Sequence, residues 1–535
     1  MSLSRFTILL FLSVAWISNA GATEPSTADV AQQVDQALAA DLFDENTKLA
    51  PRTNDATFAR RVWLDIVGDI PTPEELTSFL LDPAPNKRES LVAKLLADPH
   101  YGQNWSRYWR DVILFRALDE RAQLVANPLE ADLGKWLNEN RSWNEIATEF
   151  ITSHGDVREV GGTAIMMAQD GQTEEIAAEV SRIFLGVQIQ CAQCHDHPYD
   201  RWKREQFHEL AAFFPRVTVR PVRDLTKRSF EVVGQDRFRR APRGNNVERQ
   251  PTAEHMMPDL EDPQAPGTQM EAKFFLTSST VPWGTTDDQR RMQLAAWLTE
   301  NEWFATAVVN RLWAELLGEG FYPSVDDIGP DREPTAPTAV KLLGEQFQAS
   351  GYDMKWLIAT ICQTEAYQRE SRPRRELEET PFTANVPQRL RSDQLYNALL
   401  SALDSAEQAP NGQQYLRGRR GSPRGKFGEV FGYDPSIARE EAASSIPQVL
   451  ALMNSGDVNR AVVQNRLNTL GELLATTPDD DELTTELFLR CLCREPTKKE
   501  IGTIRKYVKG ASNRREAFED LAWSLVNSAE FQHRN

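Results

Sequence analysis

Large aromatic side chains recur at helical spacing in the first half of the chain. Tyr101, Trp105 and Tyr108 are separated by four and then three positions, and Trp109 lies four positions after Trp105. Residues at these spacings share one face of an α-helix. Large aromatic side chains on such a face are usually buried. The pattern therefore predicts a helix that packs into a hydrophobic core.

Helical patterns continue along most of the chain and predict a mainly α fold. They run from about residue 26 to residue 214, with a helix over 55–67 and another that begins near Thr72. Thr72 and Glu75 have the spacing of a capping box, and Thr497 and Glu500 repeat it. Further helices are expected over residues 290–298, 304–317, 337–348, 354–362, 393–403, 484–492, 498–508 and 517–531.

The composition changes between Pro215 and Pro282, which marks a boundary. Val217, Val219 and Val222 indicate a short strand, and the sequence then becomes rich in arginine and proline. We therefore expect two helical domains joined by an irregular linker with a little β structure. The expected division is a signal peptide over 1–22, a first helical domain over 23–215, a linker or crossover over 216–285 and a C-terminal helical domain over 286–535.

The chain begins with a pattern typical of a secretory signal. Arg5 precedes an apolar run from Phe6 to Ile17, and small residues follow up to Ala22. The run is too short to span a bilayer, and no later segment is apolar for long enough to do so. We expect cleavage after Ala20 or Ala22 and export to the periplasm, the cell surface or the medium, without a membrane span in the mature protein.

The charge of the chain argues against nucleic acid as a partner. The formal net charge is -18, which repels phosphate backbones and anionic membrane surfaces. The stretch from Gly412 to Gly428 is basic, but its arginines lack interleaved aromatic residues that would stack on bases. We expect this stretch to be a solvated loop.

The strongest chemical signal is Cys191-Ala192-Gln193-Cys194-His195-Asp196-His197. Five scattered cysteines form a poor disulfide framework, so this pair needs its own explanation. Cysteines three apart lie on one side of a helical turn, where both thiols can add to the vinyl groups of one haem. His195 would then be an axial ligand of the iron. The motif predicts haem c held by Cys191, Cys194 and His195.

Two alternatives to haem use the same segment. Zinc or iron would be bound by Cys191, Cys194, His197 and His208, because sulfur and nitrogen ligands suit tetrahedral zinc. A Cys191–Cys194 disulfide that braces a turn is the other alternative. Whether the site binds haem iron or a zinc or iron ion, His195 and His197 are the candidate imidazole ligands.

Residues next to the cysteines are candidates for supporting roles. Asp196 and Asp200 are candidates to orient an imidazole by accepting its hydrogen bond, or else to cap the next helix. The sixth position on a haem iron has four candidate residues, none favoured by its spacing: Met166, Met167, His154 and His208.

Other reactive side chains are expected to be structural. Cys362 lies between apolar residues and is expected in the core, and Cys491 and Cys493 lie in a predicted helix, where residues two apart point to different sides. Asp65 and Asp69 are spaced as a carboxylate pair for acid–base chemistry, but we favour solvated or ion-paired side chains.

Long segments of the chain resemble a known pair of domains. FARRVWLDIVG over 58–68 and SRIFLGVQIQCAQCHDHPYDRW over 181–202 look like the planctomycete-type cytochrome-like domain of unknown function. The second half is similar to its usual companion, the planctomycete-type C-terminal domain of unknown function. The matching pieces there are WFA over 303–305, VNRLW over 309–313, VDD over 325–327, GYD over 351–353 and LVNSAEF over 525–531.

The resemblance implies an exported protein of a planctomycete-like bacterium whose cytochrome-like label depends on Cys191-x-x-Cys194-His195. Our leading hypothesis is an exported c-type haem protein that transfers electrons or serves a partner oxidoreductase. The alternatives are a non-haem zinc or iron protein or enzyme that acts on an extracellular polymer, and a structural protein of the cell surface with protein partners.

The signal pattern makes a direct prediction about the mature protein. When the chain is produced in a bacterium that exports it, mass spectrometry of the purified protein should find Gly21 or Thr23 as its first residue, because small residues precede both bonds. A protein that retains Met1 and Phe6 in the soluble extracellular or periplasmic fraction would contradict cleavage.

Overall fold

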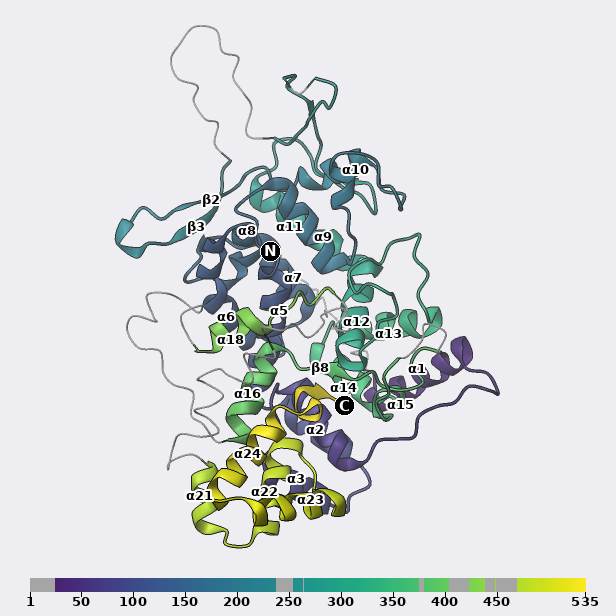
Figure 1. Ribbon diagram of the computed structural model, residues 1–535. Helices are drawn as coiled ribbons and strands as arrows, with labels where there is room; N and C mark the ends of the chain where they lie inside the picture. Colours follow the sequence, from purple (N-terminus) through teal and green to yellow (C-terminus); the bar gives the residue numbers. More distant parts are fainter. Residues whose placement is uncertain are drawn as a thin grey trace, which may run out of the picture.

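The computed structural model describes residues 25–236, 254–262, 264–374, 380–403, 423–437, 448 and 469–535. Figure 1 shows a mainly helical molecule with two helical regions, an irregular joining segment and small antiparallel sheets. The predicted fold class is therefore confirmed. The predicted signal peptide lies outside the described residues. Among those described, no helix combines the length and the apolar character that a membrane span requires.

The first region contains ten α-helices in the described chain, and all the helices predicted there are present. They are α1 (Thr27–Leu42), α2 (Asp55–Ile66), α3 (Pro73–Leu81), α4 (Lys87–Leu96), α5 (His100–Leu114), α6 (Ala126–Asn138), α7 (Trp143–Thr152), α8 (Ala164–Ala168), α9 (Thr173–Leu185) and α10 (Arg204–Ala211). Short 3₁₀ turns are η1 (Glu120–Leu124), η2 (Gly161–Thr163), η3 (Gln190–Gln193) and η4 (Leu225–Lys227).

The second region begins with α11 after the irregular segment. Its helices are α11 (Asp287–Glu300), α12 (Glu302–Leu317), α13 (Pro337–Ala349), α14 (Met354–Gln363), α15 (Glu365–Gln368), α16 (Ser392–Ala402), α18 (Pro423–Phe431), α21 (Thr469–Thr476), α22 (Asp480–Leu492), α23 (Lys498–Gly510), α24 (Arg514–Val526) and α25 (Ala529–Gln532). Both predicted capping boxes, at Thr72 with Glu75 and at Thr497 with Glu500, are formed.

The strands are short and antiparallel. The predicted strand is β2 (Val217–Pro221), which pairs with β3 (Phe230–Gly234), and β3 also pairs with β1 (Gly155–Asp156). The hairpin of β2 and β3 projects from the body (Figure 1). The other pairs are β4 (Met256–Met257) with β5 (Thr268–Gln269), β6 (Lys273–Phe274) with β7 (Ser279–Thr280), and β8 (Gln388–Arg389) with β9 (His533–Arg534).

The aromatic residues of α5 form part of the core, as their spacing predicted. Tyr101, Trp105, Tyr108 and Trp109 each expose 1% of their surface or less. Trp109 continues the contact to Trp143 of α7, with ring centroids 4.3 Å apart. The alternative that these rings form an open binding platform does not apply, because they have no accessible face.

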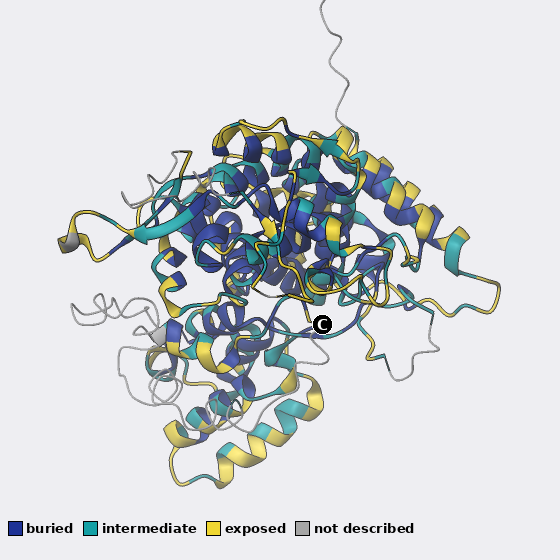
Figure 2. Ribbon diagram, turned by 90° about the horizontal axis from the view of Figure 1, so that it is seen from above, coloured by how far each residue is buried: buried dark blue, intermediate teal, exposed yellow. Residues whose placement is uncertain are grey.

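The two regions share one hydrophobic core. Helix α1 packs against α13 and α14, α7 packs against α11, and α9 packs against α12. Figure 2 shows that buried residues gather in the interior of the helical body while exposed residues lie on its outer faces. Elements far apart in the sequence therefore stabilise each other by burying apolar surface together.

A buried ion pair joins α2 to β9. Asp65 and Arg534 expose 5% and 1% of their surfaces, and Arg534 Nε lies 2.7 Å from Asp65 Oδ1. The hydroxyl of Tyr367 donates to the same carboxylate at 2.7 Å. Arg60 and Arg61 of α2 donate to the backbone oxygens of Phe531 and Asn535. The ion-paired interpretation of Asp65 is therefore confirmed.

Asp69 accepts from the hydroxyl of Ser401 at 2.7 Å.

Part of the predicted basic loop is helical. Residues 412–422 lie outside the described residues, but 423–428 belong to α18, so the prediction of a loop was wrong there. These residues are helical because aromatic side chains pack there, which the arginine-rich composition did not indicate. Phe427 and Phe431 stack with centroids 4.2 Å apart, and Phe427 contacts Tyr396 of α16.

Two predicted helix ends were also wrong. Cys493 is not helical, because it adopts a left-handed conformation with φ 55° and caps α22 through its N–H bond to the oxygen of Leu489. The helix predicted over 517–531 is divided into α24 and α25. Ser528 has extended backbone angles, and its hydroxyl accepts from the N–H of Phe531, so it begins a new helix.

The Asp65–Arg534 pair makes a prediction about stability. Replacing Arg534 with alanine should lower the free energy of unfolding by about 3–5 kcal/mol, because a buried carboxylate loses its charge partner. The double variant Asp65→Leu/Arg534→Met should recover most of this loss, because no buried charge is left unpaired. Chemical denaturation of the three proteins measures both effects. An Arg534→Ala variant as stable as the wild type would contradict the assignment.

Candidate functional site

The motif begins where α9 ends. Gly186 terminates α9 with φ 64°, in the left-handed region that favours glycine. A Cβ atom at this position would lie 2.6 Å from Cγ1 of Ile328, so the space also requires glycine. The N–H of Ile328 donates to the oxygen of Gly186 at 2.7 Å. The start of the motif is thus fixed against the second helical region.

The two motif thiols are free and accessible. Cys191 lies in η3 and Cys194 follows it, and both are exposed and not joined in a disulfide. Between them, Ala192 is fully buried and anchors the turn. The bracing disulfide is therefore not formed. The turn presents both thiols to solvent, as addition to one flat porphyrin would need.

His195 presents one free ring nitrogen. Its Nδ1 lies 2.7 Å from the backbone oxygen of Asp196 and must carry the proton in this bond. In the neutral imidazole, Nε2 then keeps its lone pair, which is the arrangement that ligand histidines usually have. The exposed His195 side chain can therefore bind a metal through Nε2.

His197 is held in the opposite sense. Its Nδ1 accepts the N–H of Tyr199 at 3.3 Å, so in the neutral ring Nε2 carries the proton. The N–H of His197 donates to the oxygen of Trp202 at 2.8 Å, which closes the turn. Trp202 is buried and meets Phe275 edge to face at 5.0 Å. His197 is thus part of a rigid turn without a free lone pair.

His208 supports the motif from beneath. It exposes 1% of its surface, and its Nε2 lies 3.0 Å from the oxygen of Gln193 while its Nδ1 lies 2.8 Å from Nε2 of His255. Donation to Gln193 leaves Nδ1 of His208 as acceptor and Nε2 of His255 as donor. Burial lowers the pKa of His208, and it lowers the pKa of His255 to about 4 against the opposing charge of Glu174. Both imidazoles are therefore neutral at neutral pH.

The zinc or iron set of Cys191, Cys194, His197 and His208 does not converge. Among the described residues, three His, Cys, Asp or Glu ligand atoms within 4.8 Å of one another occur only at His154, Asp287 and Asp288. This group of His154, Asp287 and Asp288 already contains a cation, the guanidinium of Arg291. Arg291 is fully buried, lies 2.8 Å from Asp287 Oδ2 and contacts His154 Nε2.

The four candidates for a sixth ligand are all engaged elsewhere. Met166 and Met167 are buried in α8. His154 and His208 use their ring nitrogens in the contacts just described. Sequence reasoning did not single out His255, because its segment resembled an irregular linker and no spacing relates it to the motif.

Asp196 orients His195, but through its backbone oxygen. Its carboxylate accepts from the N–H of Arg204 at 3.1 Å and from Nζ of Lys203 at 2.8 Å, at the beginning of α10. These bonds lower the pKa of Asp196. Asp200 accepts from the N–H of Arg201 at 2.8 Å. The Asp196 carboxylate therefore serves the capping alternative, whereas Asp200 accepts from a residue that precedes α10.

A buried carboxylate ties the motif helix to the second region. Asp326 is fully buried, and its Oδ2 lies 2.9 Å from Nη1 of Arg182 in α9 while its Oδ1 accepts from Gln188 at 2.9 Å. Burial raises the pKa of Asp326, but the charges of Arg311 and Arg182 outweigh it and hold the pKa at about 2. Sequence reasoning missed this contact, although Arg182 and Asp326 both lie in segments that carry the family resemblance.

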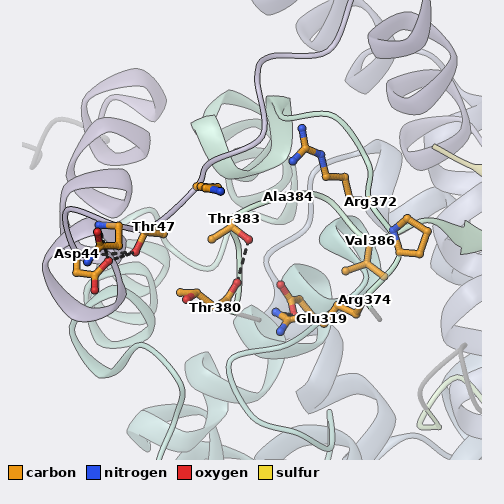
Figure 3. Close-up of a pocket in the computed structure, with 12 residues that line it drawn as sticks. Asp44, Thr47, Glu319, Arg372, Arg374, Thr380, Thr383, Ala384 and Val386 are labelled. Atoms are coloured by element: carbon orange, nitrogen blue, oxygen red, sulfur yellow. Dashed lines mark hydrogen bonds and ion pairs between the residues drawn. The ribbon is translucent and has the colours of Figure 1, made fainter. Parts of the chain in front are cut away.

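Two neighbouring cavities lie away from the motif. The larger, of about 690 Å³, is open and polar and lies beside the loop that follows α1 (Figure 3). The second, of about 480 Å³, lies along α12. Glu319, Arg374 and Val386 line both, so the Arg374–Glu319 ion pair stands between them.

Comparison with protein families gives two matches. Residues 33–219 match PSCyt2, a protein of unknown function (DUF1549), and residues 290–421 match PSD1, a protein of unknown function (DUF1553). No curated protein and no solved structure matches the chain. The first match covers most of the first helical region and the second covers the earlier part of the second region, in the order that the resemblance predicted.

The thiols provide a test of the site geometry. In reduced, haem-free protein, a disulfide reagent such as Ellman's reagent should titrate Cys191 and Cys194 rapidly. Cys362, Cys491 and Cys493 should react only after unfolding, because they are buried and burial raises the pKa of each thiol. The double variant Cys191→Ser/Cys194→Ser should lose the rapid phase. Rapid reaction that persists in it would show that the assignment of the exposed thiols is wrong.

Proposed function

From the planctomycete arrangement that this chain carries, a DUF1549 region followed by a DUF1553 region, we propose that it is an exported protein that holds a c-type haem on Cys191, Cys194 and His195. The observation that carries the proposal is the state of His195. Its Nδ1 proton is used by the oxygen of Asp196, which leaves Nε2 as a free, solvent-facing ligand beside two free thiols.

The donor set fits covalent haem better than a small metal ion. Thioether bonds need two accessible thiols at i and i+3, and the exposed turn of η3 provides them. A tetrahedral site needs four converging ligands, whereas His197 and His208 already use their acceptor nitrogens within the fold. The name of the first family model, PSCyt2, agrees with a cytochrome-like domain.

The chain's own residues would prepare the site in three ways. Asp196 fixes the ring of His195 through its backbone oxygen. His208 fixes Gln193 from beneath and so limits movement of the cysteine turn. Arg182 and Asp326 join α9 to the second region. A bound haem would supply a one-electron iron couple, and the exposed position of the motif would let a redox partner approach it.

Export belongs to the same proposal. In bacteria, haem is attached to Cys-x-x-Cys-His outside the cytoplasmic membrane, and the pattern over residues 1–22 is typical of a secretory signal. We therefore place the protein in the periplasm or at the cell surface, as an electron carrier or as a subunit that serves a partner oxidoreductase.

The test is expression of the full chain, with its signal, together with a haem-maturation system. The purified protein should retain a Soret band after denaturation, and Cys191→Ser/Cys194→Ser should lose it. His195→Ala should change the spectrum of the bound haem, because the iron loses its axial nitrogen. His197→Ala is the matched control and should keep the wild-type spectrum, because Nδ1 of His197 already accepts from Tyr199.

Two outcomes would contradict the haem proposal. Folded, exported protein without a covalently retained Soret band would overturn it. Stoichiometric zinc or iron without porphyrin, found by elemental analysis, would instead support the non-haem alternative.

A further inference from the structure

The cavity along α12 contains a buried cation without hydrogen bonds. Arg311 lines this cavity and exposes 2% of its surface, and neither of its two terminal nitrogens, Nη1 and Nη2, has a hydrogen-bond partner. Among the other buried arginines of the described chain, Arg60, Arg107, Arg216 and Arg290 leave only Nε unbonded and Arg534 leaves only Nη2, so none of them has both terminal nitrogens unbonded. A buried guanidinium that leaves its whole terminal fork unbonded is costly, so it calls for an acceptor.

Asp326 does not supply that acceptor. Its Oδ2 lies 3.5 Å from Nη2 of Arg311 without forming a hydrogen bond, because Asp326 is oriented toward Arg182 and Gln188. The carboxylate therefore offsets part of the charge of Arg311 but leaves its donors unused. Arg311 also lies over the ring of Trp109, at 5.9 Å from the centroid, which holds the guanidinium in place.

A second unsatisfied group lines the same cavity. Gln388 exposes 4% of its surface, and its Nε2 donates to the oxygen of Ala314 at 3.0 Å. This bond fixes the amide, and Oε1 of Gln388 is left buried without a donor. Arg311 and Gln388 thus both line the cavity and carry buried polar atoms without partners, and Tyr322, Val325 and Val386 form part of the walls.

The other charges around the cavity are already paired. Glu315 lies 2.9 Å from Arg391, and Glu319 is paired with Arg374. One guanidinium with unused donors is suited to a monoanion, and its planar fork matches the two oxygens of a carboxylate.

The neighbouring cavity is lined by three basic side chains, Lys48, Arg372 and Arg374, against two acidic ones, Asp44 and Glu319, so its lining has a small excess of positive charge. Figure 3 shows Arg372 and Arg374 on the wall near Glu319. Lys48 and Arg372 are exposed in this outer cavity. In a chain with a net charge of -18, such a cluster would attract anions to one place.

We propose that the cavity along α12 binds a small hydroxycarboxylate of the size of a sugar acid. Its carboxylate accepts two hydrogen bonds from Arg311, and a hydroxyl donates to Oε1 of Gln388. The aromatic and aliphatic walls contact the carbon skeleton. This site is independent of the haem proposal, because none of its residues belongs to the cysteine motif.

The experiment is calorimetric and thermal-shift titration of the full chain with D-glucuronate, D-galacturonate and L-malate. At least one acid should raise the unfolding temperature in a concentration-dependent way. D-Glucose should have no effect, because it lacks the carboxylate. In Arg311→Met, the dissociation constant for the same acid should rise at least tenfold.

Two variants separate binding from folding. Arg311→Met removes no hydrogen bond and keeps the volume of the side chain nearly unchanged, and although it removes one of the two charges beside buried Asp326, the ion pair of Asp326 with Arg182 remains. Val325→Trp narrows the cavity from a partly exposed position without touching the charge, and it should also weaken binding. If Arg311→Met does not fold, the affinity of Val325→Trp for the acid tests the proposal instead.

Three results would overturn the proposal. They are absence of binding of all three acids to folded wild-type protein, undiminished binding in both variants, and a response to inorganic phosphate that exceeds the response to every carboxylate.

Discussion

Buried ion pairs between distant segments are the interactions on which the rest of the structure depends. Arg182 meets Asp326, and Asp65 meets Arg534, each across the two helical regions. Burial of an unpaired charge is costly, so each charged side chain must be paired when the surrounding apolar residues pack around it. Apolar packing supplies most of the stabilisation, but these pairs specify which helices meet. The Arg182–Asp326 pair also helps to position the cysteine motif, because Arg182 lies in α9 and the motif follows this helix.

Local patterns could be predicted from the sequence because local forces cause them. The buried ring of Trp105, the capping box at Thr72 and the strand that begins at Val217 all follow from spacing within a few residues. Helix ends were less predictable where a single conformation decided them, as at Cys493 and Ser528. There the backbone angle depends on tertiary contacts that no local pattern encodes.

The residues of the candidate site could be proposed from the sequence, but the buried residues that hold them in place could not. Cys191, Cys194 and His195 lie within one short segment of the sequence, so a chemistry for them could be proposed without a fold. The partner of His208 could not, because His255 lies in a segment without periodicity and is 47 positions away. The cavity at Arg311 could not be inferred either, since an arginine in a helix is normally solvated and only the fold shows that it is buried.

The pairing of Asp65 with Arg534 imposes an order on folding. The two residues are separated by 469 positions, so α2 cannot reach its final environment until nearly all of the described chain has been synthesised. Until then, Asp65 lacks the charge partner that offsets the cost of its burial. Such a delay would suit the proposed export, in which the polypeptide crosses a membrane unfolded. The same contact that stabilises the folded protein thereby makes the final packing of α2 depend on the last residues of the described chain.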